Sequence, residues 1–283
     1  MHKNYTMKDL KEIVKEKYTE IAHQSKQQNQ SSCCGSGSCC SSVDYTIFSE
    51  NYNKIAGYVA DADLGLGCGL PTEYAKIKKG DTVIDLGSGA GNDCFVARSF
   101  VGEEGQVIGV DMTEAMIALA NQNCEKHGFK NVQFRLGDIE NMPIGANKAD
   151  VVISNCVLNL VPDKKKAFAE IYRVLKSKGH FSISDVVIVG TLPDPIKNAA
   201  EMYAGCVSGA LQKDQYMKYI FEQGFVNIQI QKEKEIILPD EILLDYLTES
   251  ELVAFNKSKT GIFSITVYGE KPDCGQCDTC TCM

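Results

Sequence analysis

Between residues 72 and 190 the sequence alternates regularly between short apolar runs and amphipathic stretches. The runs are rich in valine and isoleucine, as buried strands are, and the stretches between them repeat apolar residues at helical spacing. We expect strands at 81–87, 106–111, 132–138, 149–155 and 180–188. Because strands that alternate with helices form parallel sheets covered on both faces, this pattern predicts an α/β protein with a doubly wound, mostly parallel sheet.

The rhythm changes on both sides of this region. An amphipathic helix is expected at 7–23, before a linker of Gln, Ser, Gly and Cys that we expect to be mobile. After residue 195, one stretch looks helical and two others, 225–232 and 262–269, alternate like antiparallel strands. The first of these two strands also fits as a continuation of the central sheet. The predicted units are an N-terminal helix with a Cys-rich segment, the sheet domain, a smaller α+β domain and a Cys-rich tail, at 1–43, 44–190, 191–270 and 271–283.

The overall composition narrows the class of protein. The chain has 283 residues, of which 44% are hydrophobic, so it can bury a full core without disulfide bonds. Its net charge of −8, with no basic stripe, makes nucleic acids and anionic membranes poor candidates as partners. The sequence shows no apolar stretch of membrane-spanning length and no apolar core of a signal peptide. We therefore expect a cytoplasmic protein, and nothing calls for more than a monomer.

The thirteen cysteines are the outlier of this composition. Two groups of four lie in the low-complexity segments, and five lie in sequence that looks folded: Cys33, Cys34, Cys39 and Cys40; Cys274, Cys277, Cys280 and Cys282; Cys68, Cys94, Cys124, Cys156 and Cys206. In a reducing compartment, such a number indicates soft-metal or redox chemistry rather than a disulfide scaffold. Cys94 and Cys124 lie on predicted helices at apolar spacing, so we expect them to pack in the core.

The first predicted strand ends in a glycine-rich loop, DLGSGAGND at 85–93. Its glycines allow a tight turn and the close approach of a ligand at a helix N-terminus. Asp111 ends the second strand, where a carboxylate can accept hydrogen bonds from a ribose diol, and Asp138 ends the third, within reach of an adenine amino group. The loop lacks the spacing of dinucleotide-binding loops, and the carboxylate of Asp85 just before it suits a cation such as a sulfonium or an α-amino group.

Three cysteines are placed where they can react. Cys156 directly follows the fourth strand, where ligands of this fold bind, although a buried packing role fits it equally well. Cys206 is flanked by small residues, and Cys68 lies in a glycine-rich loop in the position of a lid. None of the four histidines follows a strand, so a general base is lacking. Thiolates bind soft centres such as trivalent arsenic, whose lone pair can attack a methyl sulfonium without a base.

These motifs together resemble the arsenite S-adenosylmethionine methyltransferases of the class I superfamily. The resemblance rests on the glycine loop, on DMT at 111–113, on SNCVLNLVPDK at 154–164 and on the segment around Cys206, and GCGLP at 67–71 also matches. It spans roughly residues 30–270 and implies a seven-stranded Rossmann-like methyltransferase sheet, with S-adenosylmethionine bound by 44–190 and arsenic by 191–270. The implied cofactor-binding residues are Asp85, Gly87, Ser88, Gly89, Gly91, Asp111, Met112, Asp138, Ile139 and Asn155.

The same resemblance implies a reaction, the methylation of arsenite or methylarsenite for arsenic detoxification. Arsenic, delivered as a thiol conjugate, is expected on Cys156, Cys206 and Cys68, in the role of a metal site for a substrate. Because methyl transfer formally oxidises trivalent arsenic, two electrons must return to it. A disulfide between Cys68 and either Cys33 or Cys34 is the implied source, reset by thioredoxin or glutathione.

Two other functions remain open on the sequence. A small-molecule C- or O-methyltransferase of the same fold would use Cys156 and Cys206 only for packing. A non-catalytic protein that binds soft metals would use the two Cys-rich segments, whose spacings are CC-x4-CC and C-x-x-C-x-x-C-x-C.

Overall fold

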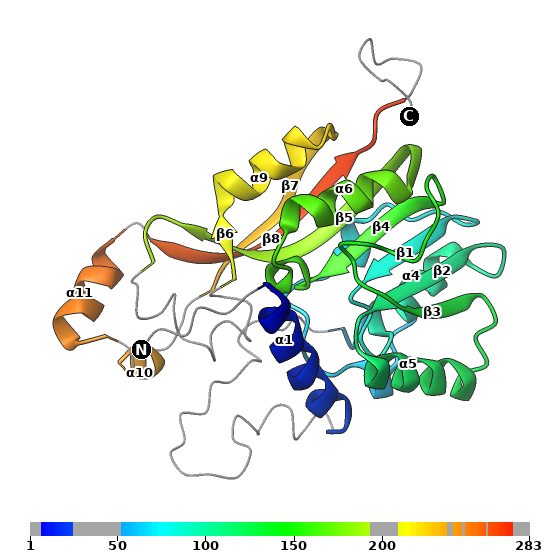
Figure 1. Cartoon of the computed structure of the whole chain (residues 1–283), viewed down its shortest axis with the longest axis horizontal. Helices are drawn as coiled ribbons and strands as arrows, with labels where there is room; N and C mark the ends of the chain where they lie inside the picture. Colours follow the sequence, from blue (N-terminus) through cyan, green and yellow to red (C-terminus); the bar gives the residue numbers. More distant parts are fainter. Residues whose placement is uncertain are drawn as a thin grey trace.

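A computed structural model of the chain describes residues 7–24, 52–192, 209–236, 240–244, 247–258 and 260–273. One mixed sheet forms its centre, with the strand order β3-β2-β1-β4-β5-β8-β7 and a two-residue strand, β6, paired to β5 (Figure 1). The strands are β1 (Thr82–Leu86), β2 (Gln106–Asp111), β3 (Val132–Leu136), β4 (Ala149–Asn155), β5 (Leu175–Val189), β6 (Leu211–Gln212), β7 (Val226–Ile236) and β8 (Gly261–Glu270). Strands β1 to β5 are parallel, so the predicted doubly wound, mostly parallel sheet of seven strands is confirmed.

Helices cover both faces of the sheet, as the alternating pattern predicts. One face packs against α6 (Lys164–Val174) and α9 (Lys213–Glu222), and the other packs against α4 (Asn92–Val101) and α5 (Glu114–Lys126). Alternate residues of each strand supply the two cores, so Ile84 enters the α6 side while Val83 enters the α4 side. Cys94 and Cys124 are buried in the α4 side, where packing was expected.

The two strands expected near the C-terminus both belong to the central sheet. β8 runs antiparallel to β5 over ten residue pairs, from His180 opposite Glu270 to Val189 opposite Gly261, and β7 pairs with the far side of β8. The continuation of the central sheet, one of the two possibilities for the strand at 225–232, is therefore what the structure has. A division of the chain at residue 190 stays a prediction.

The remaining helices are short, apart from one at the N-terminus. They are α1 (Met7–Ala22), η2 (Ala60–Ala62), α3 (Pro71–Tyr74), η3 (Leu158–Leu160), α10 (Asp240–Leu243) and α11 (Glu249–Lys257). The sequence analysis missed α11, although Thr248 and Glu251 form a capping box at its start. β5 also begins at Leu175, five residues before the predicted strand, directly after α6. Among the described residues, no helix is long and apolar enough to cross a membrane.

The end of β8 is held to the sheet by one buried lysine. Lys271 Nζ donates hydrogen bonds to the carbonyl oxygens of Tyr172 and Leu175, at the C-terminus of α6, and to Asn147 Oδ1. Its backbone N–H also donates to Gly179 O. A cation at a helix C-terminus satisfies carbonyl groups that the helix itself leaves without donors.

Replacing Lys271 should therefore destabilise the fold. Lys271→Met keeps the apolar stem but leaves one buried and two partly buried acceptors without their charged donor, at a cost of about 2–3 kcal/mol in the free energy of unfolding. Urea unfolding followed by circular dichroism measures this cost. The matched control is Lys178→Met, because Lys178 pairs with Asp273 on the surface and its loss should leave the midpoint unchanged. Equal midpoints for the two variants would contradict the anchoring role of Lys271.

Candidate functional site

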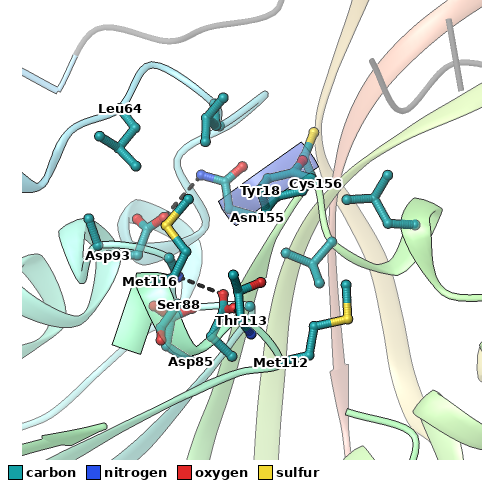
Figure 2. A pocket seen from close by; sticks show the side chains of 18 of the residues that line it. Tyr18, Leu64, Asp85, Ser88, Asp93, Met112, Thr113, Met116, Asn155 and Cys156 are labelled. Carbon is teal, nitrogen blue, oxygen red and sulfur yellow. Dashed lines mark hydrogen bonds between the residues drawn. The ribbon is translucent and has the colours of Figure 1, made fainter. Parts of the chain in front are cut away.

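A pocket opens at the carboxyl ends of the parallel strands, where ligands of doubly wound folds bind (Figure 2). The space within it is about 1100 Å³ when the open solvent at its mouth is included. Most of its wall comes from six regions of the chain, namely the glycine loop, the end of β2, the end of β4, the turn after β3, the loop before α3 and the inner face of α1. All the residues expected to bind the cofactor line it except Gly91.

The glycine loop leaves room for a ligand against its backbone. Gly89 has a φ of +49°, and a side-chain carbon added there would meet no atom within 4 Å. Its N–H donates to Asp111 Oδ2 over 3.0 Å, and Thr113 N donates to Asp111 Oδ1 over 2.8 Å. The backbone therefore holds the carboxylate of Asp111 in place, with both oxygens beside the pocket.

Two buried carboxylates lie at the base of the pocket. Asp85, on β1, is 2% exposed, and Asp93, in the first turn of α4, is 9% exposed. Burial raises the pKa of Asp85 well above its ordinary value, and the charge of Asp93 adds to this effect. Burial likewise raises the pKa of Asp93 to about 6, although hydrogen bonds from Asn155 and Tyr52 act in the opposite direction. Two desolvated carboxylates side by side favour a cationic ligand, which would relieve their repulsion.

Other polar groups of the pocket also point to a ligand. Ser88 Oγ and Asn92 Oδ1 are buried and have no hydrogen-bond partner within the described structure. The described lining carries five aspartates (Asp63, Asp85, Asp93, Asp111 and Asp138) and a single lysine, Lys11. Unpaired polar atoms, a row of acids and open space at Gly89 fit the cationic, hydrogen-bonding nucleoside S-adenosylmethionine, the cofactor expected from the sequence.

The turn after β3 carries the residues expected at the adenine. Ile139 is buried, and both Ile139 and Met112 line the pocket. Asp138 Oδ1 accepts a hydrogen bond from Glu140 N, and its other oxygen accepts one from Lys11 Nζ over 2.5 Å. Burial alone would lower the pKa of Lys11, but its hydrogen bonds to Asp138 and Glu140 raise it. The sequence analysis missed Lys11, which comes from the N-terminal helix more than 120 residues away.

Asn155 joins the pocket to the loop that carries Cys68. Asn155 Oδ1 accepts hydrogen bonds from the N–H groups of Cys68 and Gly69, and its Nδ2 donates to Tyr52 Oη, Gly69 O and Asp93 Oδ2. Tyr52 Oη in turn donates toward Asp93, 3.0 Å away. The side chain of Asn155 lines the pocket, but its polar atoms hold the 67–69 loop. Neither Tyr52 nor Asp93 was predicted to belong to the site, and only Asp93 has a signal in the sequence, since it ends the glycine loop two residues after Gly91.

The glycines on either side of Cys68 allow this close packing. A side-chain carbon at Gly67 would lie 2.6 Å from Asn155 Nδ2, and one at Gly69 would lie 2.4 Å from Ser184 Oγ. Any larger residue would push the loop away from the strand ends. Cys68 O also accepts a hydrogen bond from Ser264 Oγ, on β8, over 2.7 Å. The GCG sequence is therefore what brings the sulfur of Cys68 to the end of β4.

Cys68 and Cys156 form a disulfide bond, with their Cα atoms 5.8 Å apart. Both are buried, at 1% and 5% exposure. Cys156 has a φ of +61°, in the left-handed region that costs a residue with a side chain about 1–2 kcal/mol. Its N–H donates to Ser184 O, so the neighbouring strand holds it in this conformation. Strained residues of this kind gather at functional sites, and Cys156 lies at the edge of the pocket (Figure 2).

The structure joins Cys68 to Cys156, a disulfide that the sequence did not predict, whereas the pairing of Cys68 with Cys33 or Cys34 in turnover stays a prediction. Cys68 meets Cys156 because Asn155 fixes the 67–69 loop directly beside the end of β4. Cys33, Cys34 and Cys206 lie outside the described residues, as does every cysteine of the two Cys-rich segments, so their roles stay predictions. Among the described residues, no group of three or more His, Cys, Asp or Glu could hold a metal ion.

Comparison with known proteins identifies the family to which the chain belongs. Residues 77–224 match the model of a family described as a methyltransferase domain. The chain is 39% identical over 276 residues to an arsenite methyltransferase of Halobacterium salinarum, an alignment that covers 93% of this chain and 67% of that protein. It is 36% identical over 193 residues to the human arsenite methyltransferase, covering 63% of this chain and 52% of that protein.

Solved structures agree with this comparison. An arsenic(III) S-adenosylmethionine methyltransferase from Chlamydomonas reinhardtii superposes with a TM-score of 0.63 at 34% identity, over 75% of this chain and 69% of that one. A phosphoethanolamine N-methyltransferase of Haemonchus contortus, solved with S-adenosylhomocysteine, superposes with a TM-score of 0.56 at 23% identity, over 73% of this chain and 54% of that one. The second likeness shows the fold alone.

The raised pKa of Asp93 predicts a pH-dependent affinity for S-adenosylmethionine. A cation binds the ionised carboxylate, so binding must expel any proton held there. Affinity should be full above pH 7 and fall as the pH drops through about 6, to about a tenfold higher Kd at pH 5. Equilibrium dialysis with labelled S-adenosylmethionine measures this. Adenosine, which carries neither the sulfonium nor the α-amino charge, should show little change, and a flat profile for both ligands would contradict the assignment of the acids.

Proposed function

Because this chain belongs to the arsenite methyltransferase family, we propose that its pocket binds S-adenosylmethionine and that it methylates trivalent arsenic held by cysteine thiolates at the end of β4. The observation that carries the proposal is the convergence of two kinds of group at one edge of the sheet. The acidic pocket suits the cationic methyl donor, and two buried sulfurs adjoin it on the Cys68 and Cys156 side. The physiological result is arsenic detoxification.

The chain's own residues bind and orient the methyl donor. Asp85 and Asp93 attract its positive charges, and the backbone-held carboxylate of Asp111 accepts hydrogen bonds from its ribose. When bound, S-adenosylmethionine supplies a methyl group made electrophilic by the sulfonium. Asp138, Ile139 and Met112 form the part of the wall that suits an adenine ring. Holding the donor in a single orientation lowers the barrier to an in-line methyl transfer.

The arsenic site forms when a thiol reductant reduces the Cys68–Cys156 disulfide to two thiols, whose thiolates then lie in apolar surroundings. Cys156 and Cys206 are the proposed principal ligands and Cys68 is the third, because soft thiolates bind trivalent arsenic more strongly than oxygen ligands do. Cys68 and Cys156 pack with Val14, Leu160 and other apolar residues in one buried cluster. These apolar surroundings would keep water away from bound arsenic. No proton has to be removed from the substrate, so the site needs no general base.

The electron balance of the reaction assigns a second role to Cys68. The arsenic lone pair forms the new bond to carbon, while the bond between that carbon and the donor sulfur breaks. Arsenic is thereby formally oxidised from the trivalent to the pentavalent state. Two cysteine thiols can return two electrons by forming a disulfide, which thioredoxin or glutathione then reduces. Cys68 is the proposed member of that pair, because its sulfur already bonds to another cysteine in the site. Cys33 or Cys34 remains its proposed partner during turnover.

The first test is the methylation of arsenite by the purified, reduced protein. With S-adenosylmethionine and a thiol reductant, we expect methylated arsenic, measured by chromatography with element-specific detection. Cys156→Ser and Cys206→Ser should each lower the rate by roughly a hundredfold or more, because a hydroxyl does not replace a thiolate ligand.

Cys124→Ala is the matched control, because Cys124 is buried in the core on the α4 side of the sheet. Its rate should remain near that of the wild type. If arsenite is still methylated when both Cys156 and Cys206 are replaced, the arsenic must bind at another site. Binding of S-adenosylmethionine without any methylated arsenic would support the small-molecule methyltransferase instead.

The second test asks whether Cys68 is oxidised to a disulfide during turnover. Enzyme that is first reduced and then freed of external thiol should make a limited amount of product and stop, with Cys68 in a disulfide. Peptide mapping by mass spectrometry identifies its partner, and added thioredoxin with its reductase should restart turnover. A stalled enzyme in which Cys68 is still a free thiol would rule out its role as the electron donor.

A further inference from the structure

The N-terminal helix α1 forms one wall of the pocket, although neither the strand pattern nor the family motifs include it. Lys11, Val14 and Tyr18 line the cavity, and their spacing places them on one face of the helix. In Figure 1, α1 lies across the carboxyl edge of the sheet, and it packs against α5. A ligand held between α1 and the strand ends would be covered by this helix.

A partly buried ion pair holds the N-terminal half of α1 to the rest of the fold. Lys11 Nζ bonds to Glu140 Oε2, and the side chain of Glu140 is only 6% exposed. The other oxygen of Glu140 accepts a hydrogen bond over 2.7 Å from the N–H of Asp163, the residue that caps α6. Lys11 thus connects α1 both to the turn after β3 and to the start of α6.

The same lysine also occupies Asp138, the acid expected to meet the adenine. Lys11 Nζ lies 2.5 Å from Asp138 Oδ2. Asp138 is more exposed than Glu140, at 41% of its side chain, so a ligand can replace Lys11 there while the bond to Glu140 stays. Asp138 is therefore available to bind the ligand, while Glu140 holds Lys11 of α1.

The middle of α1 lies beside the part of the pocket that carries Cys68 and Cys156. Val14 is 4% exposed and packs in the same apolar cluster as Cys68 and Cys156. Tyr18 packs against that cluster together with Met112, and Figure 2 shows Tyr18 beside Cys156. One helix face thus covers both the expected adenosine end of the donor and the thiols.

We infer that α1 is a lid over the methyl-donor pocket and that Lys11, through Glu140, is the positioning residue that keeps it closed. Cofactor enters and product leaves when this ion pair opens, and bound ligand in turn favours the closed helix. The inference rests on the proposed function only for the identity of the ligand, S-adenosylmethionine.

Lys11→Gln tests the lid, with Lys15→Gln as the matched control. Lys15 is one turn further along α1 and does not line the pocket. With labelled S-adenosylmethionine and the full chain, Lys11→Gln should speed dissociation by about tenfold, since a partly buried, charge-assisted contact is lost. Lys15→Gln should dissociate as the wild type does. Equal dissociation rates for all three proteins would overturn the inference.

Hydrogen exchange separates a lid from a merely structural contact. In the wild type, saturating S-adenosylmethionine should slow exchange of the amides of α1, and Lys11→Gln should lose most of that protection. Glu140→Gln keeps an acceptor for Asp163 N, and combining it with Lys11→Gln should add little to the dissociation rate, because both remove one interaction. Two results would also overturn the inference. One is amide exchange in α1 that does not change when S-adenosylmethionine binds. The other is a double variant whose increase in dissociation rate equals the product of the increases in Lys11→Gln and Glu140→Gln.

These readouts do not depend on arsenic. Slower exchange in α1 on binding S-adenosylmethionine, in a protein that methylates no arsenite, would support the lid and reject the proposed substrate. Arsenite methylation with identical dissociation rates in the wild type and Lys11→Gln would reject the lid and keep the proposed function.

Discussion

The burial of negative charge at the carboxyl edge of the sheet is the constraint on which the site depends. Asp85 and Asp93 lie side by side away from water, and neither has a cation of the described chain as a hydrogen-bond partner. Such an arrangement costs stability unless a ligand supplies the missing charge. The fold tolerates it because the carboxylates accept hydrogen bonds from Cys94, Tyr52 and Asn155. The site is thus prepared for a cation before one binds.

The donor pocket and the sulfur site are parts of one hydrogen-bonded unit. Asn155 touches Asp93 with its amino group and the backbone of Cys68 with its carbonyl oxygen, so a single side chain reaches both. Cys156, the next residue, is held in its left-handed conformation by β5. A change in the occupancy of the acidic pocket therefore acts on groups that directly position the two sulfurs.

The sheet and the glycine loop could be predicted because local patterns determine them. Alternating apolar runs specify parallel strands, and the acids after β1, β2 and β3 then meet at one edge whatever the details of packing. Other contacts depend on long-range geometry that no local pattern carries. Lys11 meets Glu140 across 129 residues, Tyr52 meets Asn155 across 103, and Cys68 meets Cys156 across 88. The short helix α11 was missed although its capping box was readable, because its apolar residues, Leu252 to Phe255, are consecutive and show no helical period.

The antiparallel direction of β8 also determines where the chain leaves the fold. Because β8 runs back along β5, residues 271–273 lie at the amino edge of the sheet, with Lys271 fastened to α6 and the reactive groups at the opposite edge. For protein engineering this is a useful separation. A label attached to the side chain of residue 273 would lie at the edge away from the pocket, so the protein can be tethered there without obstructing the pocket.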